Sequence, residues 1–450
     1  MSRVADAFPP VRLAVVAALA APVVVLGAVP PLQFADWAWV SLCLAAPVVV
    51  WGAAPFHRTA WRALRRGTAT AETLVSAAVL AASVWSLALL SPGDTRTLAV
   101  HDRFWVLPGR DPAPGDHLYL AVAVLLTVAA LAGRTGGSGP RSPARAATGG
   151  AGPYAVVVAV LAGGAFGFWL TAGGPGRATG TAAAVLVAAC PAAVALAVPA
   201  AHLRAARRGA QLGVRVRTPA GLARATQVDT IVFGPADLTG TGAGTGTGTG
   251  DVDSVVELSA AGAVPALREL GLRTVLLTPG DPQGSLALAG RVGIAEVFAE
   301  IVPRDRIAVV RRLQNEGRIV AFVGDAADVH DRSALAQADL GLGRAGPAGP
   351  DGSGGGGRDC RGDGDLGLAD GDLWNAADAV RLARATRRTA ARNEALAYAG
   401  SGAILPLAVA GQLTPLVVLA AAALAGLAIA ASSQRLRSFR SARPPAHQRP

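Results

Sequence analysis

Long apolar runs separated by short polar segments make up most of the chain. An α-helix needs about 20 apolar residues to cross the hydrocarbon core of a bilayer, and about eight runs approach that length. The runs occupy residues 11–29, 36–52, 71–90, 117–132, 153–173, 180–200, 396–412 and 414–431. The pattern therefore predicts a polytopic α-helical membrane protein. The lipid bilayer is one of its expected partners.

A different pattern occupies the chain between the sixth and seventh runs. Short strands rich in β-branched residues alternate there with amphipathic helices. The expected strands are 230–233, 273–278, 318–325 and 339–343. Apolar strands that alternate with helices are typical of a parallel sheet covered on both faces. Residues 201–395 are therefore predicted to form a connector and one Rossmannoid α/β domain, whose last helix, 376–393, leads into the seventh run.

Arginines are distributed unevenly over the loops. The loop after the second run contains Arg58, Arg62, Arg65 and Arg66, and residues 432–450 form an arginine-rich tail. Loops rich in basic residues stay on the cytoplasmic side of a membrane. Counting runs from that loop predicts that both termini and the α/β domain are cytoplasmic.

The sixth run is interrupted by two prolines, Pro191 directly after Cys190 and Pro199 further on. A proline inside a helix removes a backbone hydrogen bond and frees a carbonyl. Lipid tolerates this only where neighbouring groups satisfy the carbonyl. A thiol beside such a break is a candidate ligand for a soft cation such as monovalent copper. The alternative interpretation is that Cys190 packs there as a small apolar side chain.

This run, the arginine-rich connector after it and the strand 230–233 resemble the core of the heavy-metal (copper-type) P-type ATPases. In that family the helix carries Cys-Pro-Cys or Cys-Pro-X, and the strand ends in Asp-Lys-Thr-Gly-Thr, whose aspartate is phosphorylated by ATP. The resemblance implies a haloacid-dehalogenase-like fold for the α/β domain and ATP-driven transport of a metal cation, copper above all. It also implies Mg²⁺ and ATP as cofactors and a bacterial-type plasma (inner) membrane as the location.

The phosphorylated aspartate of the family corresponds to Gly234, which has no side chain that could attack phosphorus. Asp237 follows three residues later. A displacement of ~1 Å of a reacting group can lower a rate about a hundredfold, so Asp237 is better interpreted as a turn or capping residue. No catalytic residue is therefore expected, and Asp237 is only a weak candidate for the nucleophile.

Three further motifs of the family are present in altered form. Thr278 matches the hydroxyl that contacts phosphate in the family's Thr-Gly-Asp-Asn loop. Arg306 stands where the family has a phosphate-binding lysine, and we expect it at a solvated helix start because arginine does not replace a compact ammonium group. Asp325 ends a strand and matches a Mg²⁺ ligand, with Asp328 or Asp331 as the second. The spacing is longer than in the family, so a solvated acidic loop is the alternative.

The chain is short where the family has two of its domains. Residues 133–152 are predicted to be a flexible linker in place of the actuator domain. A glycine-rich insert, 240–253, takes the place of the nucleotide-binding domain, so no nucleotide-binding residues are expected and ATP binding is in doubt. A second glycine-rich insert, 344–372, is expected to lack regular structure. The predicted division is four spans in 1–132, the linker 133–152, two spans in 153–200, the connector and α/β domain in 201–395, two spans in 396–431 and the tail 432–450.

Composition supports this interpretation. Hydrophobic residues make up 52% of the chain and charged residues 16%, as in an integral membrane protein with a modest soluble part. All 41 basic residues are arginine, so the formal charge of +11 reflects a compositional bias and no nucleic-acid partner is expected. Most ion ligands of the family are also replaced: its second cysteine is Ala192, and its Tyr-Asn pair on the seventh run is Gly400-Ser401.

These observations favour a catalytically inactive pseudo-ATPase that works by binding or assembly. Its expected partner is another membrane transporter or a second copy of itself. Residual ATP-dependent translocation of copper is the alternative in the enzyme class, and a decaying gene product without function is the third hypothesis. The intact apolar runs argue against decay, because random drift would scatter charges over segments that face lipid.

Overall fold

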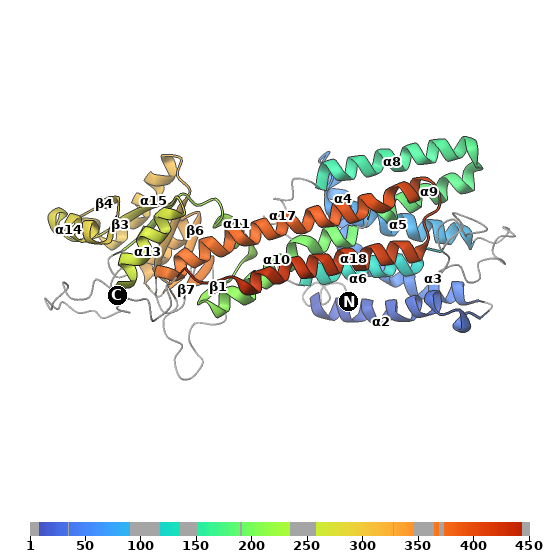
Figure 1. Cartoon of the computed structure of the whole chain (residues 1–450), viewed down its shortest axis with the longest axis horizontal. Helices are drawn as coiled ribbons and strands as arrows, with labels where there is room; N and C mark the ends of the chain where they lie inside the picture. Colours follow the sequence, from blue (N-terminus) through green and yellow to red (C-terminus); the bar gives the residue numbers. More distant parts are fainter. Residues whose placement is uncertain are drawn as a thin grey trace. The chain divides into compact units, whose positions relative to one another are not determined.

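The computed structural model describes residues 9–34, 36–90, 118–135, 151–189, 191–234, 258–326, 328–344, 364–368 and 373–442. The chain divides into two compact units, and Figure 1 labels many of their helices and strands. The helical unit comprises Met1–Arg141, Arg145–Ala201 and Ala390–Ser433. The sheet unit comprises Ser142–Ala144, His202–Thr389 and Gln434–Pro450.

The helical unit is built from apolar helices joined by turns. Its described helices are α2 (Pro9–Ala28), α3 (Trp37–Pro47), α4 (Ala54–Leu64), α5 (Ala71–Leu89), α6 (Leu120–Thr135), α8 (Ala151–Ala172), α9 (Gly174–Ala188) and α18 (Pro415–Gln434), with parts of α10 (Pro191–Gln211) and α17 (Leu373–Val409). A π-helical turn, η2 (Val48–Gly52), continues α3. Helix α9 contacts both α5 and α8, and α2 contacts α6.

Small side chains form much of the core between these helices. Ala78, Ala82, Ala123 and Ala188 are completely buried, as is the larger Tyr119. Lipid tails give apolar helices no hydrophobic reason to associate, so close packing of small residues has to hold the helices together. The buried alanines therefore bring the helix backbones close to one another.

Among the described residues, four helices are long and apolar enough to cross a bilayer: Val11–Ala28, Ala71–Leu89, Gly152–Ala172 and Pro415–Ser438. The pair Trp37–Gly52 and Ala54–Leu64, bent by 52°, makes a fifth if it is one span. The expectation of about eight spans is therefore not confirmed. One reason is visible at the sixth apolar run, which is divided between α9, ending at Ala188, and α10, beginning at Pro191.

The sheet unit contains, among its described residues, a seven-stranded sheet of order β1-β7-β6-β5-β2-β3-β4. The strands are β1 (Val214–Val216), β2 (Thr230–Phe233), β3 (Arg273–Leu277), β4 (Glu296–Phe298), β5 (Val320–Asp325), β6 (Leu340–Arg344) and β7 (Leu366–Leu368). Neighbouring strands are parallel except β1, which is antiparallel to β7. The accompanying helices are α11 (Pro219–Arg224), α13 (Leu258–Glu269), α14 (Pro282–Val292), η4 (Pro303–Asp305), α15 (Arg306–Asn315) and α16 (Val329–Gln337).

Strand β2 occupies the middle of the parallel part of this sheet. Ile231 pairs with Thr274 of β3 on one side and with Ala321 of β5 on the other. Ile231, Val232 and Phe233 have no exposed surface, as expected for a parallel strand covered on both faces. The parallel α/β sheet predicted from the sequence is confirmed. The helix expected over 376–393 is the first part of α17, which continues into the seventh apolar run.

Strand β7 corrects the expectation that 344–372 lacks regular structure. Leu366 and Leu368 are buried and pair with β6. Gly364, just before the strand, has a φ of +79°, and a Cβ on it would lie 2.8 Å from the carbonyl oxygen of Gly341. A three-residue apolar segment has no periodicity of its own, so it becomes a strand only because β6 and β1 lie on either side of it.

Candidate functional site

The carboxyl ends of β2, β3 and β5 lie side by side, and each carries a residue that the sequence indicates as functional. Gly234 follows β2, Thr278 follows β3, and Asp325 is the last residue of β5. Strand β2 lies between the other two. Ligands of open parallel sheets bind at this edge of the sheet, which we call the carboxyl edge. The structure therefore brings three of the predicted positions together.

Gly234 lies at the centre of the carboxyl edge. It is buried and contributes only backbone atoms. Covalent phosphoryl transfer to this position would need a side-chain carboxylate. Asp237, the weak candidate for that role, lies outside the described residues, so its role stays a prediction.

Thr278 organises the turn that leaves β3. Its side chain is buried, with 6% of the residue exposed. The Thr278 hydroxyl oxygen accepts a hydrogen bond from the Gly280 N–H at 3.1 Å, and the Thr278 N–H donates to the Phe298 carbonyl at 3.0 Å. The hydroxyl that would contact phosphate in the family therefore holds a local turn here.

Arg306 and Asp331 form an ion pair close to the carboxyl edge. Their side chains are only 13% and 7% exposed. The other carboxylate oxygen of Asp331 accepts a hydrogen bond from the N–H of Asp325 at 3.0 Å. The expectation that Arg306 lies at a solvated helix start is therefore wrong. A buried carboxylate needs a cationic partner, and the guanidinium at the start of α15 supplies it.

Gly324 permits this arrangement. A Cβ at Gly324 would lie 2.6 Å from the Phe322 ring and 3.1 Å from the carboxyl carbon of Asp331. The first separation is too short for a Cβ and the second is tight, so a side chain here would displace the Phe322 ring or the Asp331 carboxylate. The ion pair thus depends on the glycine before Asp325.

The predicted Mg²⁺ ligands do not fit a metal site as they are arranged. One oxygen of Asp331 is bound to Arg306 and the other to the Asp325 N–H. Asp328 caps α16 by accepting a hydrogen bond from the His330 N–H at 2.7 Å. No group of three or more His, Cys, Asp or Glu side chains that could hold a metal ion occurs among the described residues. The Arg306 guanidinium pairs with this carboxylate.

The break in the sixth apolar run is surrounded by hydroxyl groups. Cys190 itself lies outside the described residues. The carbonyl of Ala189 just before it accepts hydrogen bonds from Ser401 at 2.9 Å and from the Tyr154 hydroxyl at 3.1 Å. The Tyr154 ring also contacts the Tyr398 ring, with centroids 4.7 Å apart. Side chains from α8 and α17 therefore satisfy a carbonyl at the break. No local pattern around Tyr154 indicates this role.

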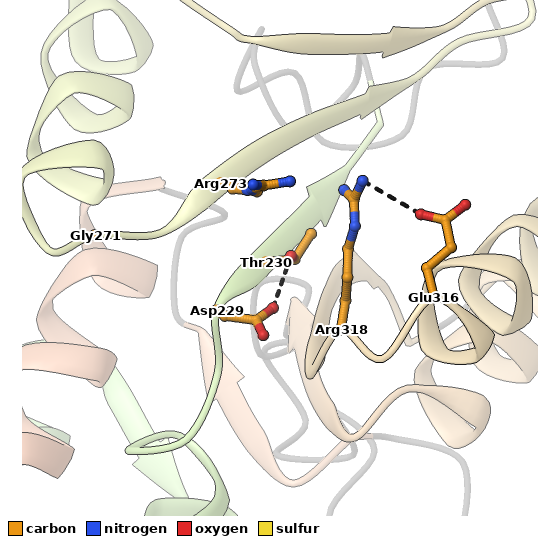
Figure 2. Close-up of a pocket in the computed structure, with 6 residues that line it drawn as sticks. All are labelled: Asp229, Thr230, Gly271, Arg273, Glu316 and Arg318. Atoms are coloured by element: carbon orange, nitrogen blue, oxygen red, sulfur yellow. Dashed lines mark hydrogen bonds and ion pairs between the residues drawn. The ribbon is translucent and has the colours of Figure 1, made fainter.

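The opposite, amino edge of the sheet contains a hollow of about 440 Å³, shown in Figure 2. It is lined by Asp229, Thr230, Gly271, Arg273, Glu316 and Arg318. None of these residues was singled out by the sequence. Two of its charged groups, Arg318 and Glu316, form an ion pair, and Asp229 accepts a hydrogen bond from the Thr230 hydroxyl (Figure 2).

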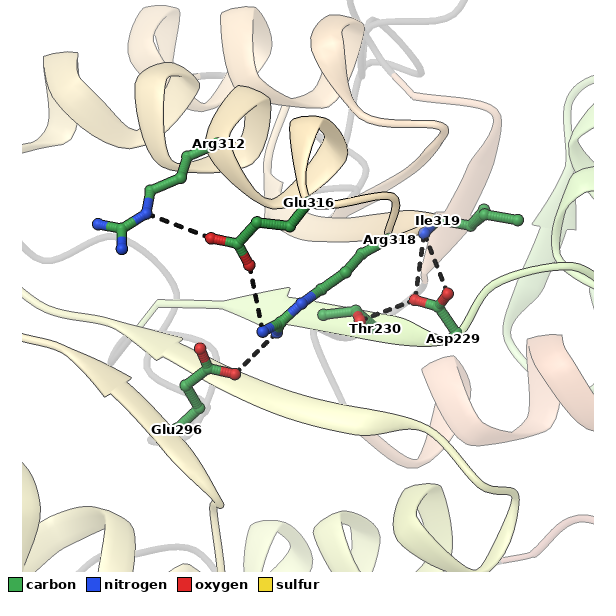
Figure 3. A network of polar contacts seen from close by, with 7 residues as sticks. All are labelled: Asp229, Thr230, Glu296, Arg312, Glu316, Arg318 and Ile319. Carbon is green, nitrogen blue, oxygen red and sulfur yellow. Dashed lines mark hydrogen bonds and ion pairs between the residues drawn. The ribbon is translucent and has the colours of Figure 1, made fainter.

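Figure 3 shows the network behind this hollow. Arg318 pairs with Glu296 at 2.8 Å and with Glu316 at 3.3 Å, while the Asp229 carboxylate accepts the Ile319 N–H at 3.1 Å. The hydrogen bond to Glu296 is the main cause that raises the pKa of the Arg318 guanidinium. These contacts tie the amino ends of β2 and β5 together, so the network is structural.

Comparisons with known proteins agree with this architecture. No family model matches the chain. The copper-exporting P-type ATPase of Mycobacterium tuberculosis (strain ATCC 25618 / H37Rv) is 28% identical over 660 positions, which cover 95% of this chain and 84% of that protein. The cation-transporting P-type ATPase B of Mycobacterium bovis is 36% identical over 50% of this chain, but over only 30% of its own length. The crystal structure of a zinc-transporting PIB-type ATPase in the E2.Pi state superposes with a TM-score of 0.63 at 15% identity, covering 95% of this chain and 99% of that chain.

The fold is therefore that of a P-type ATPase, with a helical membrane part and a cytoplasmic domain. The chain's homologues in mycobacteria are copper-exporting and cation-transporting P-type ATPases. The chain is shorter than these relatives: the alignment with the mycobacterial copper exporter spans 660 positions, whereas this chain has 450 residues. That relative consequently contains long segments that have no counterpart here.

Proposed function

We propose that this protein is a catalytically inactive pseudo-ATPase of the heavy-metal family, which acts in the membrane by binding or assembly rather than by pumping. The observation that carries the proposal is Gly234 at the carboxyl end of the central strand β2. Phosphoryl transfer there would form a bond between a carboxylate oxygen and the γ-phosphorus while the bond to the leaving ADP breaks. A glycine at that position supplies no attacking oxygen.

The pairing of Arg306 with Asp331 supports the same conclusion. In a phosphorylating enzyme the cationic group of this region would contact phosphate and the carboxylate would hold a metal ion. Here the two groups neutralise each other in a mostly buried pair. Breaking such a pair leaves a buried charge without a partner, which is strongly unfavourable. A ligand would have to replace that contact before it could use either group.

The architecture that goes with this proposal is the one expected from the sequence. About eight helices cross a bacterial-type plasma membrane, both termini are cytoplasmic, and the sheet unit is a haloacid-dehalogenase-like domain. The short segments 133–152 and 240–253 replace the actuator and nucleotide-binding domains. The partner is then another membrane transporter or a second copy of this chain.

Phosphorylation of the reconstituted protein tests the proposal. The full chain and the mycobacterial copper exporter, as the positive control, are incubated in lipid vesicles with γ-labelled ATP, with and without monovalent copper. We expect acid-stable label on the control and none on this chain. We also expect none on Gly234→Asp, because a restored carboxylate still faces an Arg306–Asp331 pair that leaves no metal site. Copper-dependent label on the wild-type chain would refute the proposal.

The size of the solubilised particle tests whether the protein assembles with another chain. Solubilised from native membranes in a mild detergent, the protein should migrate above the size of one 45.0 kDa chain and its detergent, alone or with another transporter. A strictly monomeric particle would contradict the assembly part of the proposal.

The alternative is residual ATP-dependent copper translocation, which the names of the copper-exporting relatives favour. It requires that vesicles containing this chain alone accumulate copper when ATP is added. Such accumulation would establish transport and overturn the pseudo-ATPase proposal.

A further inference from the structure

Helix α4 begins where an apolar run of the helical unit ends. Its axis is bent by 52° from that of the preceding helical segment, which ends at Gly52. One face of α4 packs on the unit: Phe56 and Ala60, one turn apart, are buried, and the helix contacts α5. The His57 Nε2–H donates a hydrogen bond to the Val49 carbonyl, in the turn before the bend, at 3.0 Å. The helix is therefore held at the end of the run and turned away from its direction.

Another side of α4 carries two large apolar side chains on the surface. Trp61 is 64% exposed and Leu64 is 55% exposed. They are three residues apart, so they are neighbours on the helix surface. Val50, in the apolar run before the bend, is 71% exposed. The exposed apolar surface of that run is thus followed by an exposed apolar pair on α4.

Arginines lie beside this apolar pair. Arg58, Arg62 and Arg65 follow one another at intervals of four and three residues, which places them along one line of the helix. All three are exposed, and their side chains form no ion pair or hydrogen bond with the described part of the chain. Like charges three and four residues apart on a helix repel one another. The line of arginines therefore favours an anionic partner from outside the helix.

The bilayer surface is the partner that fits both features. No Asp or Glu occurs in the sequence between Asp36 and Glu72, so no nearby residue supplies a counter-charge. Exposed tryptophan and leucine beside arginine are typical of a helix that lies in the membrane interface. The apolar side chains enter the hydrocarbon boundary, and guanidinium groups bind lipid phosphates with two parallel hydrogen bonds. Because α4 starts where an apolar run ends, it already lies within reach of this layer.

We propose that α4 lies in the headgroup layer of the membrane and binds anionic lipids. Trp61 and Leu64 enter the apolar boundary of that layer, and Arg58, Arg62 and Arg65 bind the phosphate groups. The helix then anchors the helical unit to the membrane surface in a way that depends on lipid charge. This inference goes beyond the proposed function and does not depend on whether the protein hydrolyses ATP.

The depth of α4 is measured by fluorescence quenching. An environment-sensitive fluorescent amino acid replaces Leu64 in the full chain. The protein is reconstituted in nanodiscs of phosphatidylcholine, alone or in equal parts with phosphatidylglycerol, whose acyl chains carry bromine near the headgroup. We expect quenching at position 64 that is stronger with phosphatidylglycerol. Changing Arg58, Arg62 and Arg65 together to Gln should remove this dependence on lipid charge.

Two further positions are the controls for depth. The same fluorescent amino acid at Val50 should be quenched equally in both lipid compositions. At Leu286, which is 62% exposed on α14 of the sheet unit, it should not be quenched. Absence of quenching at position 64 in both compositions would show that α4 faces water. That outcome would overturn the bilayer as its partner and favour an acidic soluble protein.

Lipid selectivity is measured by native mass spectrometry of the protein released from the mixed nanodiscs. We expect phosphatidylglycerol to outnumber phosphatidylcholine among the retained lipids. Arg62→Gln should weaken the binding of phosphatidylglycerol by about fivefold, the effect of one arginine near an anionic surface. The matched control is Arg311→Gln/Arg312→Gln, which changes two exposed arginines of α15 and should leave the retained lipids unchanged. Equal retention of the two lipids by the wild-type chain, or an Arg62→Gln variant that equals wild type, would overturn the proposal.

Discussion

Asp331 accepts a hydrogen bond from the backbone N–H of Asp325 at 3.0 Å, and its second carboxylate oxygen is paired with Arg306. One buried carboxylate thus joins the start of α15, the end of β5 and α16. Ligands of open parallel sheets bind at this edge, and here the three groups contact one another.

Asp331→Asn should destabilise the sheet unit by about 3–5 kcal/mol, because it leaves the Arg306 charge buried without a counter-ion. Thermal or denaturant unfolding of the full chain, followed by hydrogen exchange in α15 and β5, measures the loss. Arg312→Gln is the control: its ion pair with Glu316 is exposed, and its loss should change stability by less than about 1 kcal/mol. The double variant Arg306→Met/Asp331→Leu should be more stable than Asp331→Asn, since it removes both charges. A small effect of Asp331→Asn, equal to that of the control, would contradict the buried pair.

The hydrogen bond between Ser401 and the Ala189 carbonyl links α17 to the break in the sixth apolar run. Ser401→Ala should lower the unfolding free energy by about 0.5–1.5 kcal/mol, because a carbonyl at the break loses one of its two donors. Ser83→Ala is the matched control, since the Ser83 hydroxyl donates to the carbonyl of Val79 within its own helix. Unfolding in lipid–detergent micelles compares the two. If both variants lose the same amount, the contact across helices adds nothing.

Gly317 and Gly364 both have a positive φ, but only Gly364 has atoms close to where a Cβ would lie. Comparing their alanine variants therefore distinguishes the cost of backbone strain from the cost of a steric clash. Gly317→Ala should cost about 1–2 kcal/mol from its φ of +82° alone, since nothing lies within 4 Å of the added Cβ. Gly364→Ala has a similar φ of +79°, but its Cβ would meet the Gly341 carbonyl oxygen at 2.8 Å. It should therefore lose a further ~1–3 kcal/mol and release β7 from the sheet. Hydrogen exchange of the β6 and β7 amides distinguishes the two variants, because only Gly364→Ala should lose protection there. Equal protection in both variants would contradict a steric clash at Gly364.

His202 gives the protein a dependence on pH. Burial lowers the pKa of the His202 imidazole from its ordinary value of 6.5. The unfolded chain therefore binds a proton at a higher pH than the folded protein does. Stability should be complete above about pH 6.5 and fall as the pH drops from there towards the lower folded pKa. Melting temperatures between about pH 7.5 and 5 should decline less steeply for His202→Gln than for wild type. His330→Gln, at an exposed position on α16, is the matched control.

Much of the candidate site could be inferred from local sequence. A strand that ends in glycine, and a second strand that ends in Asp325, have to meet at one edge because parallel strands share their direction. The strand order β5-β2-β3 places these ends next to one another. The role of Arg306 could not be inferred in the same way. From the sequence, the start of its helix is expected to be solvated. The Arg306 side chain is buried because α16 brings Asp331 next to it, where Gly324 leaves room for the carboxylate.

The sequence by itself determined the class of the molecule. Apolar runs predict helices that favour lipid, alternating β-branched segments predict a covered parallel sheet, and Gly234 offers no side-chain nucleophile wherever the strand lies. These properties follow from the chemistry of neighbouring residues, so no tertiary contact is needed to infer them. The tertiary structure decided which polar groups satisfy one another. Ser401 is 212 residues from Ala189, and Asp331 meets Arg306 across 25 residues. Such pairs exist only when folding removes both groups from water, because burial makes an unpaired donor or charge unfavourable.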